Sequence, residues 1–390
     1  MQEEQEPGSR SPSLPHLFFA FLRLGATAFG GPAMVAYIRK MAVEKNHWLD
    51  DHSARDGVAL CQTIPGATAM QMSAYIGFRA RGVGGAAASF IGFGLPAFLF
   101  MMILSALYVQ THTLPAVVSA FNGLQAIVVA LVANATLSFG RASIKNWRNV
   151  INALIAAGLF GLKVSPILVI IIAAFLGMIL YNKQPVFSTA IPMKKAHAPK
   201  SFFLLLLSIG IGFGLLFFLD RRLFDLTTLM FRIDLFAFGG GFASVPLMFY
   251  EIVQVRSWLD GPTLLNGLVL GQVTPGPIVI TATFVGYLLK GPLGGLLATV
   301  CVFLPSFMIV VGIVPYFDRL RSSPYFKKII SGILCSFVGL LLTVTIRFAL
   351  DIPWDVPRVL LSGAAFIALI LKVDILWVLL TGTVIALIVL

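Results

Sequence analysis

The stretch FLRLGATAFGGPAMVAYIRK (residues 21–40) contains Gly30, Gly31 and Pro32 within an apolar run where a membrane-spanning helix would be continuous. Each glycine destabilises a helix by about 1 kcal/mol relative to alanine, and proline fits the first turn of a new helix. The stretch therefore predicts a helix, a break and a second helix. The same pattern recurs in RIDLFAFGGGFASVPLMFY (residues 232–250), around Gly239, Gly240 and Gly241.

The two interruptions belong to an internal repeat. Phe29-Gly30-Gly31 recurs as Phe238-Gly239-Gly240 at a spacing of 209, and Trp48-Leu49-Asp50 recurs as Trp258-Leu259-Asp260 at a spacing of 210. Further pairs at these spacings are Arg23 with Arg232, Gln62 with Gln272, Pro65-Gly66 with Pro275-Gly276, and Leu162-Lys163-Val164 with Leu371-Lys372-Val373. Such a constant spacing predicts two homologous halves.

The composition predicts an integral membrane protein. Of the 390 residues, 58% are hydrophobic and only 11% are charged, against about 25% charged residues in soluble domains. The three cysteines and five histidines lack the spacing of a disulfide framework or a metal site, so we expect no metal, no cofactor and no enzymatic activity. The net charge of +12 is explained first by basic cytoplasmic loops, with an anionic substrate or lipid as the alternative, and not by a nucleic-acid partner.

Hydropathy divides the chain into thirteen apolar segments and predicts an all-α polytopic membrane protein. Four segments, at 150–162, 165–181, 357–371 and 373–390, are short for a bilayer and are expected to form tilted hairpins. Seven segments separate the starts of the two repeats. Because this number is odd, we expect two repeats of inverted topology.

The broken segments, at 14–42, 57–78, 224–250 and 263–289, could cross the membrane or form re-entrant hairpins. The re-entrant arrangement places more Lys and Arg on the cytoplasmic side, so we expect about nine full crossings plus four re-entrant segments. Both arrangements leave the N-terminus cytoplasmic and the C-terminus outside. The expected organisation is a disordered cytoplasmic tail (1–13), a first transport repeat (14–181), a linker (182–223) with a connecting helix at 202–219, and a second, inverted transport repeat (224–390).

The breaks also predict an anion-binding site. The first amides of each new helix have no carbonyl partner, and a helix N-terminus carries roughly half a positive charge. Ile64-Pro65-Gly66 and Thr274-Pro275-Gly276-Pro277 form a second, duplicated break. Four positive helix ends predict a substrate site near the membrane midplane, with close helix packing as the alternative explanation for the small residues.

Two intramembrane arginines and two glutamines complete the predicted site. An arginine is costly to bury, so Arg23 and Arg232 are expected to be paired or functional, with snorkelling to the interface as the alternative for Arg23. Gln62 and Gln272 supply neutral hydrogen bonds that replace a hydration shell. The predicted substrate-binding residues are Arg23, Gly30, Gly31, Pro32, Gln62, Pro65, Gly66, Arg232, Gly239, Gly240, Gly241, Gln272, Thr274, Pro275, Gly276 and Pro277.

Two acidic residues are candidates for proton coupling. Asp234 lies within the body of an apolar segment, and Glu251 lies at the end of the same segment. Asp234 could carry a coupling proton, or it could neutralise Arg232 two residues away. Its repeat counterpart is Gly25, so the first half has no carboxylate at this position.

Several blocks resemble the chromate ion transporter (CHR) family in its long, two-domain form. They are FLRLGATAFGGP, HWLDD, CQTIPGATAMQMSAYIGFRARGVGG, RIDLFAFGGGFASVPLMFYEIV and GQVTPGPIVITATFVGYLLKGPLGG. The resemblance implies a plasma-membrane secondary carrier that exports chromate from the cytoplasm, driven by the proton-motive force, with sulfate as a look-alike anion. It implies that FGGP (29–32), PG (65–66), FGGG (238–241) and PGP (275–277) are functional motifs. The first half departs from the family's PGP pattern at Ala67.

Two other functions keep the broken helices. An anion channel would need no coupling carboxylate, and an uptake carrier for sulfate-like oxyanions is the other alternative. The expected partners are chromate or a sulfate-like oxyanion, protons and the lipid bilayer. The oligomeric state stays open between monomer and homodimer.

Overall fold

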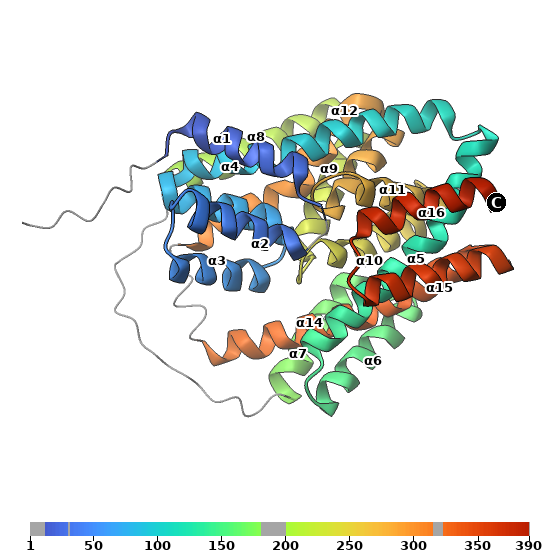
Figure 1. The fold of residues 1–390 in the computed structure, drawn as a ribbon. Coiled ribbons are helices and arrows are strands. Elements are labelled where there is room, and N and C mark those ends of the chain that lie inside the picture. The colour runs from blue at the N-terminus through green and yellow to red at the C-terminus, as the bar shows by residue number, and fades with distance from the viewer. Residues whose placement is uncertain (1–11, 30–31, 181–199, 315–322, 390) are drawn as a thin grey trace, which may run out of the picture.

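The computed structural model describes residues 12–29, 32–180, 200–314 and 323–389, which are mostly helical (Figure 1). Five helices are long and apolar enough to cross a membrane: α4 (Thr68–Thr111), α5 (Pro115–Ser143), α8 (Lys200–Leu219), α12 (Thr281–Ile313) and α14 (Pro324–Asp351). Among the described residues, four apolar helical stretches are shorter: α7 (Pro166–Leu180), Gly241–Val255, α15 (Val356–Ile370) and α16 (Ile375–Val389). Helix α6 (Trp147–Gly161) is of similar length. The predicted all-α polytopic membrane protein is therefore confirmed.

The broken elements of the first half recur in the second. The first half contains α1 (Leu14–Thr27), α2 (Pro32–Lys40), η1 (Met41–Lys45) and α3 (Asp51–Thr63). The second contains α9 (Arg221–Phe236), η2 (Gly241–Ala243), α10 (Ser244–Met248), η3 (Phe249–Val255), α11 (Gly261–Val273) and η4 (Ile278–Ile280). Positive φ angles repeat as well: 49° at both His47 and Ser257, and 64° and 63° at Lys163 and Lys372. The sequence repeat is therefore also a repeat of backbone conformation.

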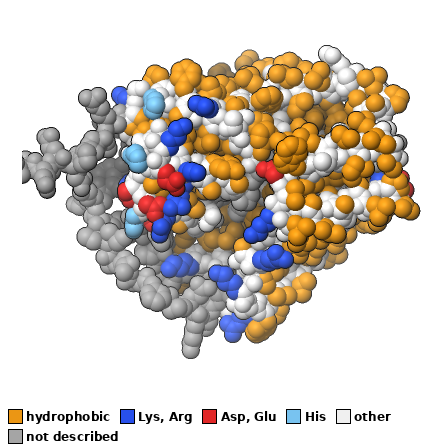
Figure 2. All heavy atoms as spheres, in the orientation of Figure 1, with side chains coloured by type: hydrophobic (Ala, Val, Ile, Leu, Met, Phe, Trp, Pro, Cys, Tyr) orange, Lys and Arg blue, Asp and Glu red, His pale blue; other side chains and the backbone are white. Residues whose placement is uncertain are grey.

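Surface chemistry follows the fold. Figure 2 shows hydrophobic side chains over most of the visible face, while Lys, Arg, Asp, Glu and His gather at the end of the molecule where α1, α2 and α3 lie. Charged side chains belong in the headgroup region or in water, whereas apolar ones face the lipid tails. We therefore expect the end that carries α1, α2 and α3 to lie at a membrane surface, with the apolar face toward the lipid tails.

Helices α4 and α12 each fold back on themselves. The turns lie at Arg81-Gly82 and Lys290-Gly291, where the backbone leaves the helical conformation. The Ser89 hydroxyl donates to the Ser73 carbonyl at 2.7 Å, which a straight helix would hold some 24 Å apart at 1.5 Å per residue. Each of these helices is thus a short limb followed by a long limb.

The broken segments return to the side on which they began. Trp48, just after η1, lies against His16 near the start of α1, with ring centroids 5.6 Å apart. The Tyr75 hydroxyl, in the short limb of α4, donates to the Ser53 carbonyl near the start of α3 at 2.9 Å. These contacts support the re-entrant arrangement, in which the breaks lie at the inner ends of the hairpins.

The equivalent helices α5 and α14 run antiparallel. Thr136 and Thr345, which are 209 residues apart, approach within 3.3 Å through their hydroxyls. Further along α5, the Ser143 carbonyl lies 3.5 Å from the Cys335 sulfur, so the contact on α14 moves backwards along the chain. Because both helices are long enough to cross a bilayer, this pairing supports the inverted topology of the two halves.

Helix α8 has no counterpart within the repeats. None of its described residues is fully buried within the chain. Its end meets the turn of α12, where the Lys290 ammonium lies 2.8 Å from the Asp220 carboxylate. This hydrogen bond lowers the pKa of the Asp220 carboxyl. If the broken segments are re-entrant, as the sequence predicts, the first half crosses an even number of times, and α8 is then expected to invert the second half.

Some expected boundaries differ or remain untested. Helix α9 begins at Arg221, inside the range expected for the linker, because the Asp220 side chain caps it by accepting from the amides of Arg222 and Leu223. The expected tail over residues 1–11 and the polar linker over 181–199 lie outside the described residues.

We predict that Lys163 and Lys372, at the tips of the two short hairpins, face opposite sides of the membrane. Lys163→Cys and Lys372→Cys should react with an impermeant maleimide from outside and from the cytoplasm, respectively. The background should have alanine at the buried cysteines Cys61, Cys301 and Cys335. Labelling of both positions from one side would contradict the inverted topology.

Candidate functional site

Helix ends flank all four predicted breaks. Helix α3 ends at Thr63 and α4 begins at Thr68, and α11 ends at Val273 before η4 begins at Ile278. The other two breaks separate α1 from α2 and α9 from η2. Gly30 and Gly31 lie outside the described residues, but α2 begins at Pro32, as expected for proline in a first turn.

The breaks of the two halves are hydrogen-bonded to one another. The Gly66 amide donates to the Ala237 carbonyl at 2.9 Å, and the equivalent Gly276 amide donates to the Ala28 carbonyl at 3.1 Å. Gly66 and Gly276 adopt φ angles of 119° and 109°, which side chains other than glycine rarely allow. These reciprocal bonds hold the breaks together inside the protein.

A cavity of about 400 Å³ lies where the breaks meet. Among the residues predicted for the site, those that line it are Gln62, Gly239, Gly240, Gly241, Gln272, Thr274, Gly276 and Pro277. The other lining residues are Met34, Val35, Ala36, Arg39, Val58, Thr68, Ala69, Phe139, Phe242 and Ile278. Among the described lining residues there is no Asp or Glu, so the cavity presents neutral donors and one cation.

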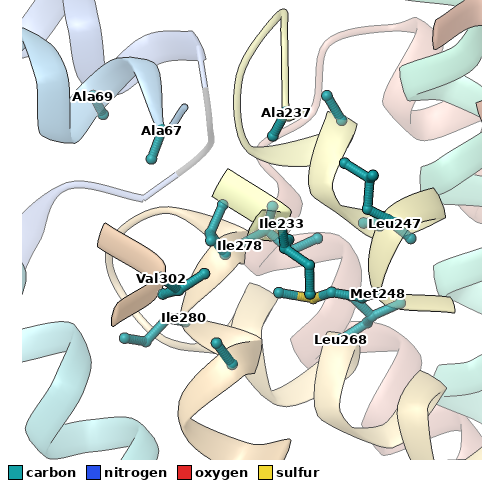
Figure 3. Close-up of a cluster of buried hydrophobic side chains, with 14 of the residues drawn as sticks. Ala67, Ala69, Ile233, Ala237, Leu247, Met248, Leu268, Ile278, Ile280 and Val302 are labelled. Atoms are coloured by element: carbon teal, nitrogen blue, oxygen red, sulfur yellow. The ribbon is translucent and has the colours of Figure 1, made fainter. Parts of the chain in front are cut away.

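Apolar side chains form a rigid support beside the breaks. Figure 3 shows this buried cluster, which joins the start of α4, the end of α9, α10, α11, η4 and α12. Its labelled members are Ala67, Ala69, Ile233, Ala237, Leu247, Met248, Leu268, Ile278, Ile280 and Val302. All of them are less than one-tenth exposed, so the unwound backbone is fixed by close packing around it.

The two predicted arginines do not line the cavity. Arg23 is exposed, on the face of α1 opposite Leu17, Phe21 and Gly25, which pack inward. Arg232 donates to Glu251 at 3.3 Å, and Glu251 also forms an ion pair with Arg256. Among the described residues the ion-pair partner of Arg232 is thus Glu251 and not Asp234, and the role of Arg23 and Arg232 in attracting the anion stays a prediction.

Arg39 lines the cavity and was missed by sequence reasoning. It lies seven residues after Pro32, and its Nε donates to Asp51 at 3.1 Å. Asp51 also pairs with Arg55 at 2.6 Å. The repeat gives no signal for Arg39, because Met248 occupies the equivalent position in the second half. The signal lies in the helix period: Arg39 follows the cavity-lining residues Val35 and Ala36 by one turn of α2, so the three share one face.

The start of α3 fixes the partner of Arg39. Asp50 is the N-cap, and its carboxylate accepts from the Ser53 amide at 2.8 Å and from the Ser53 hydroxyl at 2.7 Å. These hydrogen bonds lower the pKa of the Asp50 carboxyl. A capped helix end holds Asp51 in place, and Asp51 in turn fixes Arg39, which lines the cavity.

Asp234 is fully buried behind the start of α4. Its Oδ2 accepts from the Ser306 amide at 2.9 Å and from the Ser306 hydroxyl at 2.7 Å. Its other oxygen, Oδ1, has no hydrogen-bond partner among the described residues. The carboxyl group thus has one anchored oxygen and one vacant acceptor.

Ser306 also satisfies the first break. The Ala67 amide donates to the Ser306 hydroxyl at 2.9 Å. In the repeat, Ala67 corresponds to Pro277, which has no amide hydrogen to satisfy. Ser306 corresponds to Ala97, which has no hydroxyl group. The departure from PGP at Ala67 is therefore compensated by the pair Ser306 and Asp234.

We predict that proline at position 67 rescues the loss of Ser306. Ser306→Ala leaves the buried Ala67 amide unpaired, which should reduce stability by about 1–3 kcal/mol. Ala67 has φ −74°, which suits proline, so Ser306→Ala combined with Ala67→Pro should unfold at a higher temperature than Ser306→Ala alone.

The control is Ser105→Ala, because the hydrogen bond that the buried Ser105 hydroxyl makes in the described part of the chain is to the Met101 carbonyl of its own helix. Its thermal unfolding in detergent should change little. A double variant no more stable than Ser306→Ala would show that the Ala67 amide is not the group that Ser306 satisfies.

Comparison with known proteins follows the same division into halves. The chain matches the protein family described as Chromate transporter over residues 15–178 and again over residues 224–387. An uncharacterized transporter of Methanocaldococcus jannaschii is 44% identical over 377 residues, covering 96% of this chain and 94% of the relative.

Two further relatives carry the name chromate transport protein. The one from Pseudomonas aeruginosa is 30% identical, covering 91% of this chain and 86% of the relative. The one from Cupriavidus metallidurans is 29% identical, covering 92% of this chain and 88% of the relative. No solved structure matches the chain.

Proposed function

The chain belongs to the chromate transporter family, and from that premise we propose that it is a secondary carrier that exports chromate from the cytoplasm. The central cavity carries this proposal, because helix-start residues of both halves face one space there. Chromate is a tetrahedral dianion, and the cavity offers it amides, carboxamides and one arginine. Sulfate, with the same charge and shape, is the proposed competitor.

Backbone and carboxamide donors hold the proposed anion. Thr68 and Ala69 start α4, and Gly241 and Phe242 start the segment after the second glycine motif. Amides in a first turn have no acceptor within their helix, and the helix end is partly positive. The buried Nε2 of Gln272 also lacks a partner among the described residues, so it is free to donate to an oxyanion.

The two sides of the protein differ in a way that suits alternating access. On the first-half side, Ala36 and Phe139 line the cavity. The counterparts of these residues in the second half face no cavity that we describe: Val245 is fully buried, and Phe348 packs against Phe249 with ring centroids 5.2 Å apart. We propose that this is the inward-facing state, and that exchange of the two arrangements opens the site outward.

The membrane potential supplies the proposed driving force. Each elementary charge that crosses the membrane changes the free energy by about 2.3 kcal/mol per 100 mV. A potential that is negative inside therefore favours exit of a dianion by about twice that amount. The electrical part of the proton-motive force is sufficient for export without a chemical proton gradient.

Asp234 is the proposed proton site. A Cβ atom at Gly66 would lie 3.2 Å from its Oδ2, and the Ala67 amide reaches it through the Ser306 hydroxyl, so Asp234 lies beside the break that precedes the cavity-lining residue Thr68. An ionised Asp234 would repel a bound dianion, whereas a protonated one would not, so proton and anion binding support each other. This sign favours movement of proton and anion in the same direction, which is the behaviour of an uptake carrier. The proton gradient would then oppose export that the voltage drives.

Inverted vesicles test the proposal and its alternatives. Labelled chromate should accumulate in the lumen when the lumen is made positive, and unlabelled sulfate should compete. Trapped unlabelled chromate should accelerate entry of labelled chromate, because a carrier exchanges its substrate. Conduction without this exchange would indicate a channel. Accumulation that needs a lumen more alkaline than the medium would indicate that proton and anion move together, as in an uptake carrier.

We predict that Gln272→Glu reduces chromate flux at least tenfold. A carboxylate in the cavity would repel the dianion by several kcal/mol at an effective dielectric constant of about 20, and 1.4 kcal/mol already corresponds to tenfold. Gln110→Glu, at an exposed position in the last turn of α4, is the matched control and should transport normally. Equal flux in the two variants would place the substrate elsewhere.

We predict that Asp234→Asn removes the pH dependence of anion binding. In the unmodified chain, chromate affinity should rise as the pH falls, because protonation removes the repelling charge. The Asn variant should show one affinity at all pH values in an equilibrium binding titration. Asp225→Asn, at an exposed position near the start of α9, is the control. A pH-dependent affinity that persists in Asp234→Asn would transfer the proton site to another group.

A further inference from the structure

A second large groove, of about 940 Å³, lies between the two arms of the first hairpin: α1 forms one arm, and α2 with η1 forms the other. Tyr37, Lys40 and Glu44, in α2 and η1, face the groove. Val35 and Arg39, on the other side of α2, face the central cavity. The groove is therefore separate from the proposed transport site, and α2 is the wall between them.

The groove combines a basic rim with apolar walls. Four of its side chains are basic or can become so, and Glu44 is its single carboxylate; the four are His16, Arg23, Lys40 and Lys45. Among the described residues, none forms an ion pair with Arg23, Lys40 or Lys45. Phe19 and Tyr37 in the walls are 63% and 47% exposed. Such a surface complements a ligand with an anionic head and hydrocarbon tails.

Depth within the membrane narrows the choice of ligand. Arg23 lies nine residues after Leu14, which is about 13 Å along α1 at 1.5 Å per residue. Trp48, beside His16, marks the interfacial end of the hairpin, as tryptophan does at membrane surfaces. An exposed guanidinium below this level is unfavourable unless it reaches an anionic group. A strongly hydrated oxyanion would gain nothing from Phe19 or Leu24, whereas acyl chains would pack on both.

We propose that this groove binds an anionic phospholipid of the cytoplasmic leaflet. Its phosphate contacts Arg23 and Lys40, and its acyl chains lie along Phe19 and Leu24. Basic pockets between membrane helices on the cytoplasmic side are suited to such headgroups. By joining α1 to α2, the lipid braces the first re-entrant hairpin, whose inner end forms part of the central cavity.

The test uses the full chain, purified in detergent, with thermal unfolding followed as lipid is added. Phosphatidylglycerol should raise Tm at concentrations at which phosphatidylcholine has no effect. The variant Arg23→Gln with Lys40→Gln should need at least tenfold more phosphatidylglycerol, since each basic residue near an anionic surface contributes about fivefold. Lys145→Gln, exposed and outside the groove, is the control and should respond like the unmodified chain.

Small anions separate the lipid from a free ion. Inorganic phosphate and sulfate should neither raise Tm in the same way nor displace phosphatidylglycerol from the protein in native mass spectrometry. Displacement by either anion, equal responses to the two lipids, or an unchanged response in the double glutamine variant would each overturn the proposal.

A charge-preserving variant keeps the test decisive if the glutamine variant does not fold. Arg23→Lys with Lys40→Arg retains both cations, so its response to phosphatidylglycerol should stay within about twofold of the unmodified chain, and a lost response would also overturn the proposal. Chromate flux is measured on the same variants after reconstitution into lipid vesicles. Lost flux with an intact lipid response counts against the transport proposal alone.

Discussion

Polar backbone inside a bilayer must be hydrogen-bonded, and in this protein each half supplies acceptors for the break of the other. Gly66 donates to Ala237 in the second half, and Gly276 donates to Ala28 in the first. Neither half could therefore keep its unwound segment satisfied alone. The cavity therefore lies between the halves, and the equivalent helices α5 and α14 also join them through the contact of Thr136 with Thr345.

Departures from symmetry have physical reasons. A side chain at Gly25 would meet the Phe93 carbonyl, 2.3 Å from its Cβ, so the first half has no room for the carboxylate that the second half carries as Asp234. Asp234 in turn anchors Ser306, which satisfies the amide that Ala67 has and Pro277 lacks. The second half thus holds the ionisable Asp234, and through Ser306 this residue contacts the Ala67 break of the first half.

The repeat, the breaks and the short hairpins could be predicted because each has a local signature: a constant spacing, consecutive Gly and Pro, or a short apolar run. The positions of the arginines could not. Arg23 and Arg232 share a repeat position, but side-chain direction depends on which face of α1 or α9 packs inward, and that is a tertiary property. Arg39 had no repeated partner to reveal it. Its role follows from the fold-back of α2 and from the ion pair with Asp51.

Helix α8 connects the two halves and, in the expected topology, also sets their relative orientation in the membrane. In the expected topology each half returns to the side of the membrane on which it began, so duplication of the half without α8 would give two copies of the same orientation. A half-length ancestor of this fold would have had to insert in both orientations to form the same paired assembly, with its basic residues balanced between its two surfaces. Fusion through α8 removes that requirement. Each half of the fused chain is then free to evolve a fixed orientation and a surface charge of its own.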